Sequence, residues 1–249
     1  MLFEKLKQHE QRQHDYLSGI GHQLLTLLAS LVGNLDDLHS GLLRDTVEID
    51  DSLKWIVGQA KQCMRMVRNL SYMDKILRQE PFATSEVPMA KICIETKIDF
   101  QHLLDDKHLR LNINDRSLDT HLTVHGHIDL LRQVVVNLVD NAIKYSRKQS
   151  TIAIHGATWP RGRLLEISNQ GLPIPSELRA RVFERGFRTD RARTWVPQGT
   201  GLGLWLARLI LEAHDATITC DEVTERGRRR TRFRVLFPHP EPHRGRRPR

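Results

Sequence analysis

The sequence predicts an α+β protein in which a helical hairpin precedes an α/β sandwich. Three observations lead to this fold class. Apolar residues recur every three or four positions through residues 1–80, which is the period of a helix. A segment bounded by Pro81 and Pro88 then interrupts the pattern. Beyond it, short alternating stretches are interleaved with helical ones, which is typical of a sheet covered by helices.

Two long helices are expected in the first part of the chain. Residues 3–40 carry leucines spaced by three and four, residues 48–79 have a similar apolar face, and Ser40-Gly41 lies between them. An antiparallel hairpin is the simplest arrangement. One hairpin cannot bury so wide an apolar stripe, whereas two copies can. We therefore expect a homodimer through residues 1–80 that forms a four-helix bundle.

The rest of the chain is expected to form a second domain. The expected boundaries are 1–80 for the dimerisation hairpin, 81–88 for a linker, 89–238 for the second domain and 239–249 for a disordered basic tail. Helices are expected over 87–104, 128–145 and 201–213. Strands are expected over 109–113, 122–124, 151–157, 164–168, 217–221 and 231–237. This order predicts a mixed sheet covered on one face by helices.

The positive charge of the chain is confined to its C-terminal end. The formal net charge is +8, and residues 226–249 hold ten Arg and one Glu, so the preceding residues sum to −1. A basic end segment is not a basic groove, so no specific nucleic-acid partner is expected. No apolar run approaches the ~18 residues of a membrane span, and Met1 begins no signal peptide. Three widely spaced cysteines indicate a reduced, cytoplasmic protein.

One predicted helix combines an apolar face with an unusual set of polar residues. Asn137 and Asn141 stand one turn apart on it, and Lys144 and Tyr145 follow at its end. Amide oxygens suit a hard cation, and a lysine ammonium suits phosphate. The two asparagines alone are equally compatible with a solvated helix face.

A glycine-rich turn opens the last predicted helix. It consists of Gly199, Thr200, Gly201, Leu202 and Gly203. Such a turn exposes backbone N–H groups to phosphate oxygens, and the helix dipole adds attraction. The turn lacks the Gly-Lys-Ser/Thr of a P-loop and the preceding strand of a dinucleotide fingerprint. Alone it is therefore weak evidence for phosphate binding.

Four motifs, in this order, resemble the boxes of the sensor histidine kinases. Asn137–Ser146 (NLVDNAIKYS) is similar to the N box and Ile167–Ile174 (ISNQGLPI) to the G1 box. Val182–Arg188 (VFERGFR) is similar to the F box and Gly199–Leu204 (GTGLGL) to the G2 box. The resemblance implies the ATP-binding α/β sandwich that these kinases share with gyrase-type ATPases, known as the GHKL type.

The same resemblance implies ATP and Mg²⁺ as ligands. Asn137 and Asn141 would hold the Mg²⁺–triphosphate, with Asn141 as the metal ligand. Lys144 and the amides of the glycine turn would neutralise phosphate charge. Tyr145, at the end of the same helix, is counted among the nucleotide-binding residues.

The G1-like motif departs from the family pattern of Asp-x-Gly-x-Gly. Asn169 stands at the position of the aspartate that accepts the adenine amino group, and Pro173 replaces the last glycine. An amide oxygen can accept the same hydrogen bond without its charge-assisted strength. Gly171 is retained and is counted among the nucleotide-binding residues.

An Arg-rich stretch lies between the G1-like and G2-like motifs. A long irregular segment in a compact domain is usually functional or disordered, and we interpret this one as a lid over ATP. Arg188 is a candidate phosphate contact. Phe183 and Phe187 are expected to pack the lid against the domain rather than touch the nucleotide.

The first predicted helix contains a stretch, Tyr16–Leu28, that resembles the H box. By the resemblance, His22 is the phosphorylated residue. His22 and Thr26 project from one face a turn apart, so the Thr26 hydroxyl can orient a water beside the imidazole. Gln23 stands where the family has an acidic residue, and an amide cannot take a proton. The rival histidine, His14, lacks the surrounding apolar pattern.

The resemblance implies an ATP-dependent protein-histidine kinase. Such a kinase autophosphorylates His22 and passes the phosphoryl group to an aspartate of a response-regulator receiver domain. Thr26 would support the reverse, phosphatase activity. Gln23 and Asn169 leave open a degenerate kinase that acts as a phosphatase or scaffold for a response regulator. A nucleic-acid binder that uses the arginine tail is the remaining alternative.

Overall fold

Two compact units, Met1–Asp74 and Lys75–Arg249, make up the chain. The structure, a computed structural model, describes residues 21, 24–41, 45–114, 122–197, 199–225 and 227–239. His14, His22, Gln23 and the predicted tail beyond residue 239 lie outside the described residues. Among the helices of the described part, none has both the length and the apolarity that a membrane span requires.

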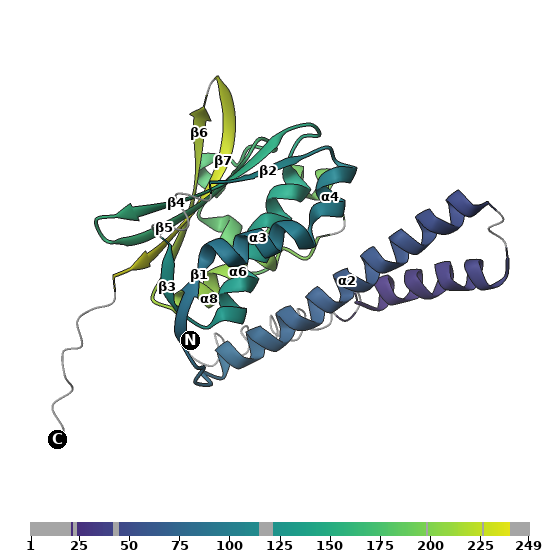
Figure 1. The fold of residues 1–249 in the computed structure, drawn as a ribbon, viewed down its shortest axis with the longest axis horizontal. Coiled ribbons are helices and arrows are strands. Elements are labelled where there is room, and N and C mark those ends of the chain that lie inside the picture. The colour runs from purple at the N-terminus through teal and green to yellow at the C-terminus, as the bar shows by residue number, and fades with distance from the viewer. Residues whose placement is uncertain are drawn as a thin grey trace, which may run out of the picture. The chain divides into compact units, whose positions relative to one another are not determined.

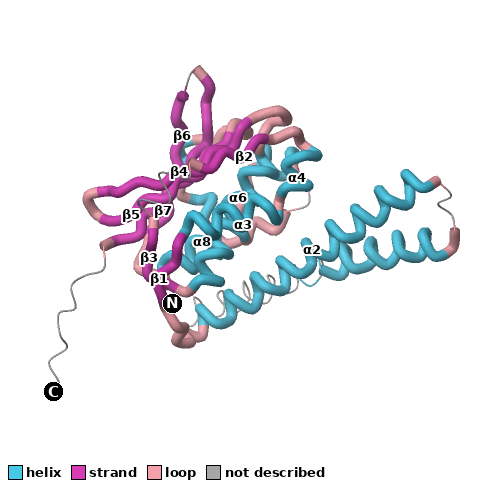
Figure 2. Tube along the Cα trace, viewed as in Figure 1, coloured by secondary structure: helices cyan, strands magenta, loops and turns pink. Residues whose placement is uncertain are grey.

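The described part of the first unit forms the antiparallel hairpin that the sequence predicts (Figures 1 and 2). Residues 24–39 are helical, and α2 spans Thr46–Leu77. Gly41 follows the first helix at φ +68°, a conformation that favours glycine. Asp45 Oδ1 accepts a hydrogen bond from the Val47 N–H at 3.1 Å and so caps α2. Both helices leave large apolar side chains exposed, among them Leu25, Leu28, Val32, Leu35, Leu53, Val57, Met64 and Val67.

A five-stranded mixed sheet is the centre of the second unit. Its strand order is β2-β4-β5-β7-β6, with β2 parallel to β4 and the other neighbours antiparallel. The strands are β2 (Arg110–Ile113), β4 (Thr151–Trp159), β5 (Gly162–Asn169), β6 (Thr217–Glu225) and β7 (Arg228–Pro238). A separate antiparallel pair is formed by β1 (Ser85–Pro88) and β3 (Thr123–Gly126).

Helices cover one face of this sheet, as predicted (Figures 1 and 2). They are α3 (Met89–Asp99), α4 (Gln101–Asp106), α6 (Ile128–Tyr145) and α8 (Gly203–Glu212). Between β5 and α8 the chain forms two 3-10 turns, η1 (Ser176–Leu178) and η2 (Arg181–Phe183), and the short helix α7 (Asp190–Trp195). Buried side chains fill the space between the layers, including Leu131, Val134, Leu138, Leu165, Ile167, Phe233 and Val235. Each such side chain contributes about 1.5–3 kcal/mol relative to an exposed one.

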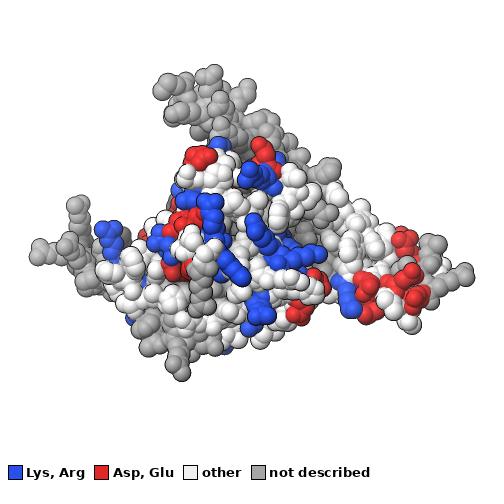
Figure 3. All heavy atoms as spheres, turned by 90° about the horizontal axis from the view of Figure 1, so that it is seen from above, with Lys and Arg blue, Asp and Glu red and all other residues white. Residues whose placement is uncertain are grey.

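The opposite face of the sheet carries a network of ion pairs along β7 and its neighbours. Arg232, which alternates with buried Phe233 along β7, donates to both carboxylate oxygens of Asp221 at 2.9 and 3.0 Å. These hydrogen bonds hold the pKa of the Asp221 carboxyl below its usual value. Glu166 lies 3.4 Å from Arg232, and Arg234 lies 2.6 Å from Asp221. Basic and acidic side chains are likewise interspersed in the view of Figure 3.

The single helix predicted over residues 87–104 is wrong at its start and in its middle. Val87 and Pro88 belong to β1, where Val87 pairs with Val124 and is fully buried. Helix α3 begins only at Met89, and Phe100 separates it from α4. A strand of four residues is too short for apolar periodicity to distinguish it from the first turn of a helix. Part of the predicted linker is therefore a strand of the second unit.

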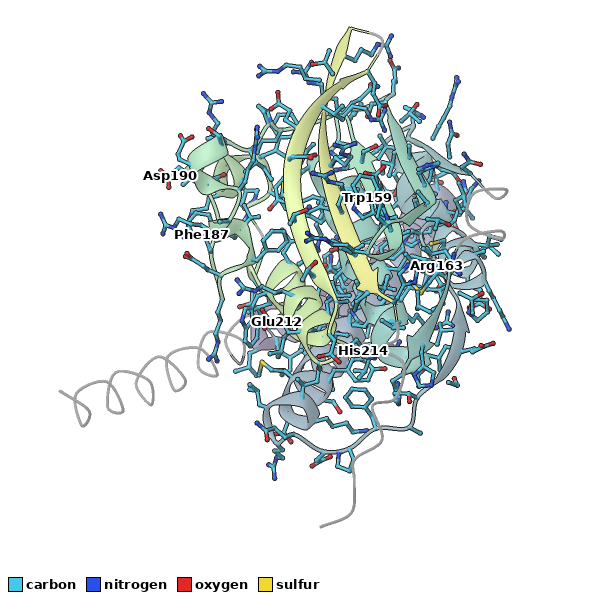
Figure 4. The ribbon with its side chains drawn as sticks, turned by 90° about the vertical axis from the view of Figure 1, so that its left-hand side faces the viewer. Trp159, Arg163, Phe187, Asp190, Glu212 and His214 are labelled. Carbon is cyan, nitrogen blue, oxygen red and sulfur yellow. The ribbon has the colours of Figure 1, made fainter. Side chains whose placement is uncertain are left out.

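Phe82, which follows α2, contacts two histidines of the second unit. Its ring stacks on that of His214 with centroids 5.0 Å apart and meets the His127 ring edge-on at 5.8 Å. The Nε2 of His214, which follows Glu212 and α8 (Figure 4), accepts a hydrogen bond from the His127 N–H at 3.0 Å. Its Nδ1 lies 2.7 Å from the Ile210 carbonyl oxygen and therefore donates to it. Burial is the main reason why the pKa of His214 is lowered, so the neutral imidazole is the form that fits.

Low pH should weaken the packing of His214 against Phe82 and His127. Because the pKa of His214 is lower in the folded state, the unfolded state binds more protons as the pH falls. The stabilisation is present above the unfolded pKa of about 6.5 and is lost as the pH falls through the lowered folded pKa. We expect the free energy of unfolding in urea to fall more steeply between about pH 8 and pH 5 for the wild type than for His214→Gln. His125→Gln, which removes an exposed imidazole nearby, is the control, and equal slopes for wild type and His214→Gln would contradict the assignment.

Candidate functional site

Asn137 is buried in α6 with an incomplete set of hydrogen bonds. The residue is 7% exposed, and its Oδ1 accepts a hydrogen bond from Gln133 Nε2 at 2.9 Å. Its Nδ2 has no partner among the described residues. A buried donor without a partner costs about 1–3 kcal/mol. An oxygen supplied by a ligand would therefore be a favourable partner for Nδ2.

The next polar residues of α6 are less buried. Asn141, one turn after Asn137, is half-buried, and its side chain forms no hydrogen bond with the described residues. Lys144 Nζ lies 2.6 Å from Asp140 Oδ2. The Lys144 ammonium is thus paired with a carboxylate one turn earlier on α6.

Lys107 fixes the end of α6 and was not singled out in the sequence. Its ammonium donates to the carbonyl oxygens of Ile143 and Lys144 at 2.9 and 3.0 Å. A cation at this position complements the negative end of the helix dipole. Burial is the main reason why the pKa of Lys107 is lowered. Because Lys107 is far from α6 along the chain, no local pattern could have indicated this contact.

The glycine turn and α6 meet at Gly203. A Cβ built on Gly203 would lie 3.7 Å from Asn137 Cγ and 3.8 Å from Asn137 Oδ1. The N-like and G2-like motifs, which are far apart in the sequence, are therefore in contact. Within the turn, the Leu202 N–H donates to Thr200 Oγ1 at 3.2 Å. The first turn of α8 thus begins beside the buried amide of Asn137.

The F-like motif closes on the same turn through two glycines. The Gly186 N–H donates to the Gly201 carbonyl at 3.2 Å. Gly186 has φ +71° and Gly201 has φ +70°, a region that side chains rarely adopt. A Cβ on Gly201 would also lie only 2.7 Å from the carbonyl carbon of Gly186. Gly201 is therefore required both for its conformation and for this close approach.

Arg188 joins the turn to the segment before it. Its Nη2 donates to the Ala192 carbonyl at 2.8 Å and to the Val196 carbonyl. Its Nη1 donates to the Gly199 carbonyl at 2.9 Å and to the Pro197 carbonyl at 3.2 Å. Both terminal nitrogens are thus occupied by backbone oxygens, and Arg188 acts as a clamp between α7 and the glycine turn. Its expected contact with phosphate, which would exchange some of these bonds, stays a prediction.

The two phenylalanines of the F-like motif differ in burial. Phe183 is 4% exposed and meets Phe233 of the sheet edge-on with ring centroids 6.1 Å apart, so it packs against the core as expected. Phe187 is half-buried, and the Arg181 guanidinium lies 4.5 Å from its ring centroid. Figure 4 shows Phe187 and Asp190 at one margin of the second unit, away from Trp159.

The G1-like motif meets the end of α6. Strand β5 ends at Asn169, which is 2% exposed and whose Nδ2 has no partner among the described residues. A Cβ on Gly171 would lie 1.8 Å from the Tyr145 carbonyl oxygen, and the Leu172 N–H donates to the same oxygen at 3.0 Å. Only glycine allows this approach. Tyr145 therefore contacts the G1-like motif through its backbone carbonyl, and its role in nucleotide binding stays a prediction.

These groups fit a magnesium-bound nucleoside triphosphate. The unpaired Nδ2 of Asn137 is a donor and suits a phosphate oxygen rather than a metal, whereas Asn141 keeps an amide oxygen for Mg²⁺. Within the described residues, no cluster of three His, Cys, Asp or Glu side chains could hold a metal. A Mg²⁺ ion at Asn141 would therefore take most of its ligands from phosphates and water.

Of the three residues predicted to act in phosphoryl transfer, only Thr26 lies among the described residues. Thr26 lies exposed on the helix of residues 24–39. His22 and Gln23 lie outside the described residues, so their roles stay predictions.

Sequence comparison relates the second unit to a known family. Residues 126–241 match the family described as "Histidine kinase-, DNA gyrase B-, and HSP90-like ATPase". These residues are similar to histidine kinase-like ATPase domains. Sensor protein SrrB of Staphylococcus aureus is 30% identical over 233 residues, which are 93% of this chain and 39% of that protein. The predicted kinship with the catalytic core of sensor histidine kinases is confirmed, and the chain spans about two fifths of the length of this curated relative.

Solved structures share the fold of the chain. The histidine kinase AdeS of Acinetobacter baumannii matches with a TM-score of 0.60 and 21% identity, over 87% of this chain and 97% of that one. The histidine kinase ThkA, solved in complex with the response regulator protein TrrA, matches with a TM-score of 0.57 and 18% identity, over 94% of this chain and 66% of that one. The predicted α+β architecture is confirmed by these matches.

Two glycines of the turn should respond differently to the same substitution. Gly201→Ala places a Cβ in the left-handed region and against Gly186, so we expect it to destabilise the second unit by about 1–2 kcal/mol or more. Gly203→Ala adds a methyl group at ordinary contact distance from Asn137, in a helix where alanine is favoured, so we expect a change within about 1 kcal/mol. Urea denaturation of the two variants measures the difference, and equal stabilities would show that the turn is not packed as described.

Proposed function

We propose that the chain is the core of an ATP-dependent protein-histidine kinase. It autophosphorylates His22 and passes the phosphoryl group to an aspartate of a response-regulator receiver domain. The observation that carries this proposal is the contact between Gly203 and Asn137, because it sets an unpaired buried amide beside the N-terminus of α8. Open N–H groups at a helix N-terminus attract phosphate, and the amide adds a further donor.

The triphosphate would lie between α6 and the glycine turn. The Gly199–Gly203 amides and Lys144 would neutralise phosphate charge, and Asn137 would donate to a phosphate oxygen. Asn141 would ligate Mg²⁺, whose charge assists the transfer by neutralising the phosphates. Arg188 would hold the segment that closes on the nucleotide, with a phosphate contact as its second role. The support is the Nδ2 of Asn137, which has no partner among the described residues, and the amide of Asn141, which forms no hydrogen bond with them.

The adenine base would lie at the other end of α6. Asn169 would accept a hydrogen bond from the adenine amino group, beside Gly171 and the Tyr145 carbonyl. Support comes from the burial of Asn169; its Nδ2, which has no partner among the described residues, would donate to an acceptor of the base. A buried amide in this state gains a partner when a base binds.

The phosphoryl transfer would use few side chains. A neutral imidazole nitrogen of His22 attacks the γ-phosphorus, the bond from this phosphorus to the bridging oxygen breaks, and ADP leaves. Catalysis rests mostly on positioning and charge stabilisation. Gln23 would accept a hydrogen bond from the other imidazole nitrogen, and Thr26 would orient water for the reverse, phosphatase reaction.

A homodimer through residues 1–80 is part of the proposal. The exposed apolar residues of the first helix, Leu25, Leu28, Val32 and Leu35, are spaced by three and four positions. Those of α2 include Leu53, Val57, Met64 and Val67, which are spaced by three, four and seven positions. Such stripes are stabilised by a second hairpin in a four-helix bundle.

The proposed partner is a response-regulator receiver domain. ThkA, which shares the fold, has been solved in complex with the response regulator protein TrrA, and this supports the choice. A cytoplasmic location is proposed together with this function. It is supported by Cys63, Cys93 and Cys220, which are all free thiols, since disulfides are rare in the cytosol.

The proposal predicts a single phosphorylated histidine. Incubation of the purified chain with radiolabelled Mg-ATP should give an acid-labile, base-stable label that His22→Ala abolishes and His14→Ala retains. Binding of ATP to His22→Ala should be unchanged, because the nucleotide is held by the second unit.

Two results would contradict this proposal. Retained labelling of His22→Ala would move the phosphorylated residue elsewhere. A wild-type chain that binds ATP but never becomes labelled would favour the alternative, a degenerate kinase that acts as a phosphatase or scaffold for a response regulator, which the amide of Asn169 also favours.

A further inference from the structure

Helices α6 and α8 are joined at both ends of their contact. Beside the glycine turn, Gly203 at the start of α8 meets Asn137 of α6. At the other end, His214, two residues after α8, accepts a hydrogen bond at Nε2 from the N–H of His127, which precedes α6. The two helices therefore run antiparallel, with about 15 Å of helix between the two contacts. His214 thus fixes the axial position of α8 against α6 from the end remote from the glycine turn.

Both ring nitrogens of His214 are committed to these two helices. Its Nδ1 donates to the Ile210 carbonyl of α8, and its Nε2 accepts from His127. His127 also caps α6, because its Nδ1 accepts a hydrogen bond from the Leu130 N–H at 3.4 Å. A Cβ on Gly126 would lie 2.7 Å from Cδ2 of the His214 ring, so the ring packs directly against the end of β3. A displaced ring would therefore disturb the ends of both helices.

Phe82 covers this joint from the segment that connects α2 to β1. It lies five residues after Leu77, where α2 ends, and three residues before Ser85, where β1 begins. Its ring is nearly parallel to that of His214, at an interplanar angle of 27°, and nearly perpendicular to that of His127, at 88°. The position of this connecting segment is therefore coupled to the joint between α6 and α8.

The joint requires a neutral imidazole. Protonation of His214 places a proton on Nε2, which can then no longer accept the hydrogen bond of His127. Burial lowers the pKa of His214, and the positive forms of His127 and His125 add to this effect. The Ile210 carbonyl and the Asp215 carboxylate act in the opposite sense. Acid therefore removes the hydrogen bond that links His214 to the start of α6.

We propose that the joint of Phe82, His214 and His127 controls the affinity of the nucleotide site between Asn137 and the glycine turn. With the joint intact, α8 holds Gly203 against Asn137. When the connecting segment withdraws Phe82, or when Nε2 is protonated, α8 shifts along α6 and the site loses affinity. His214 is a positioning residue, because it acts through α8. This inference rests on the proposed function, which supplies the nucleotide, and goes beyond it by naming how the site is regulated.

Nucleotide affinity as a function of pH tests the proposal without enzymatic turnover. The dissociation constant of a ribose-labelled fluorescent ATP analogue is measured with Mg²⁺ on the full chain between about pH 8 and pH 5. The wild type should lose about 3-fold or more affinity beyond the loss in His214→Gln, whose amide oxygen can accept from His127 throughout this range. Titration of the nucleotide itself is common to both proteins. His125→Gln, which removes an exposed imidazole nearby, should follow the wild type.

A second set of variants tests the connecting segment at pH 8 alone. Phe82→Ala should weaken binding of the same analogue by about 2- to 10-fold, which corresponds to the loss of one aromatic contact. Phe82→Leu keeps an apolar side chain over the joint and should retain most of the affinity. Thr84→Ala, at an exposed position of the same segment, should bind as the wild type does. Thermal melting checks that each variant is folded at the temperature of the binding measurement.

The outcomes separate this proposal from the one on which it rests. Equal losses of affinity with falling pH in the wild type and in folded His214→Gln overturn the role of His214. Unchanged affinity in Phe82→Ala overturns the role of the connecting segment. Both results leave the kinase proposal standing, because the nucleotide still binds. A wild-type chain that binds no nucleotide at pH 8 overturns both proposals.

Discussion

The contact between Gly203 and Asn137 is the constraint on which the rest of the site depends. The first turn of α8 lies beside α6 there, and a Cβ at residue 203 would meet the amide of Asn137 at ordinary contact distance. Gly201 then positions the turn against Gly186, and Arg188 ties the same turn to α7 through backbone carbonyls. Three motifs that are distant in sequence are thus held together mainly by backbone contacts, which explains why glycine recurs among them.

Helix α6 also sets the distance between the two ends of the site. Asn137 faces the glycine turn, and Tyr145 contacts Gly171 and the end of β5. Eight residues of helix separate the two contacts, which is about 12 Å along the axis. This length is suited to a ligand with a charged end and a planar, polar end. Lys107 donates hydrogen bonds to the last carbonyl oxygens of α6 and so stabilises this end of the helix. Asn169, whose Nδ2 has no partner among the described residues, belongs to the motif that contacts the same end.

The sequence predicted those parts of the molecule that leave a local pattern. The limits of α6 and the presence of every strand of the main sheet follow from periodic apolar residues, and the four motifs located Asn137, Asn169 and the glycine turn. Strand β1 was not predicted because four residues are too few to show a hydrophobic period. The hydrogen bonds of Lys107 to α6 and of Arg188 to backbone carbonyls form between segments that are distant in sequence or irregular. No residue spacing could therefore predict them. The lack of partners for the Nδ2 groups of Asn137 and Asn169 likewise depends on tertiary packing, which the local sequence does not show.

The central claim is that the Nδ2 groups of Asn137 and Asn169 lack partners among the described residues because one nucleotide binds to both. The most direct test is the nuclear magnetic resonance spectrum of their side-chain NH₂ groups in the full chain, recorded with and without a non-hydrolysable ATP analogue and Mg²⁺. The account predicts that both pairs of resonances shift together, with the same dissociation constant, while those of the exposed Asn112 do not. Binding of the analogue that leaves either amide unshifted would contradict it.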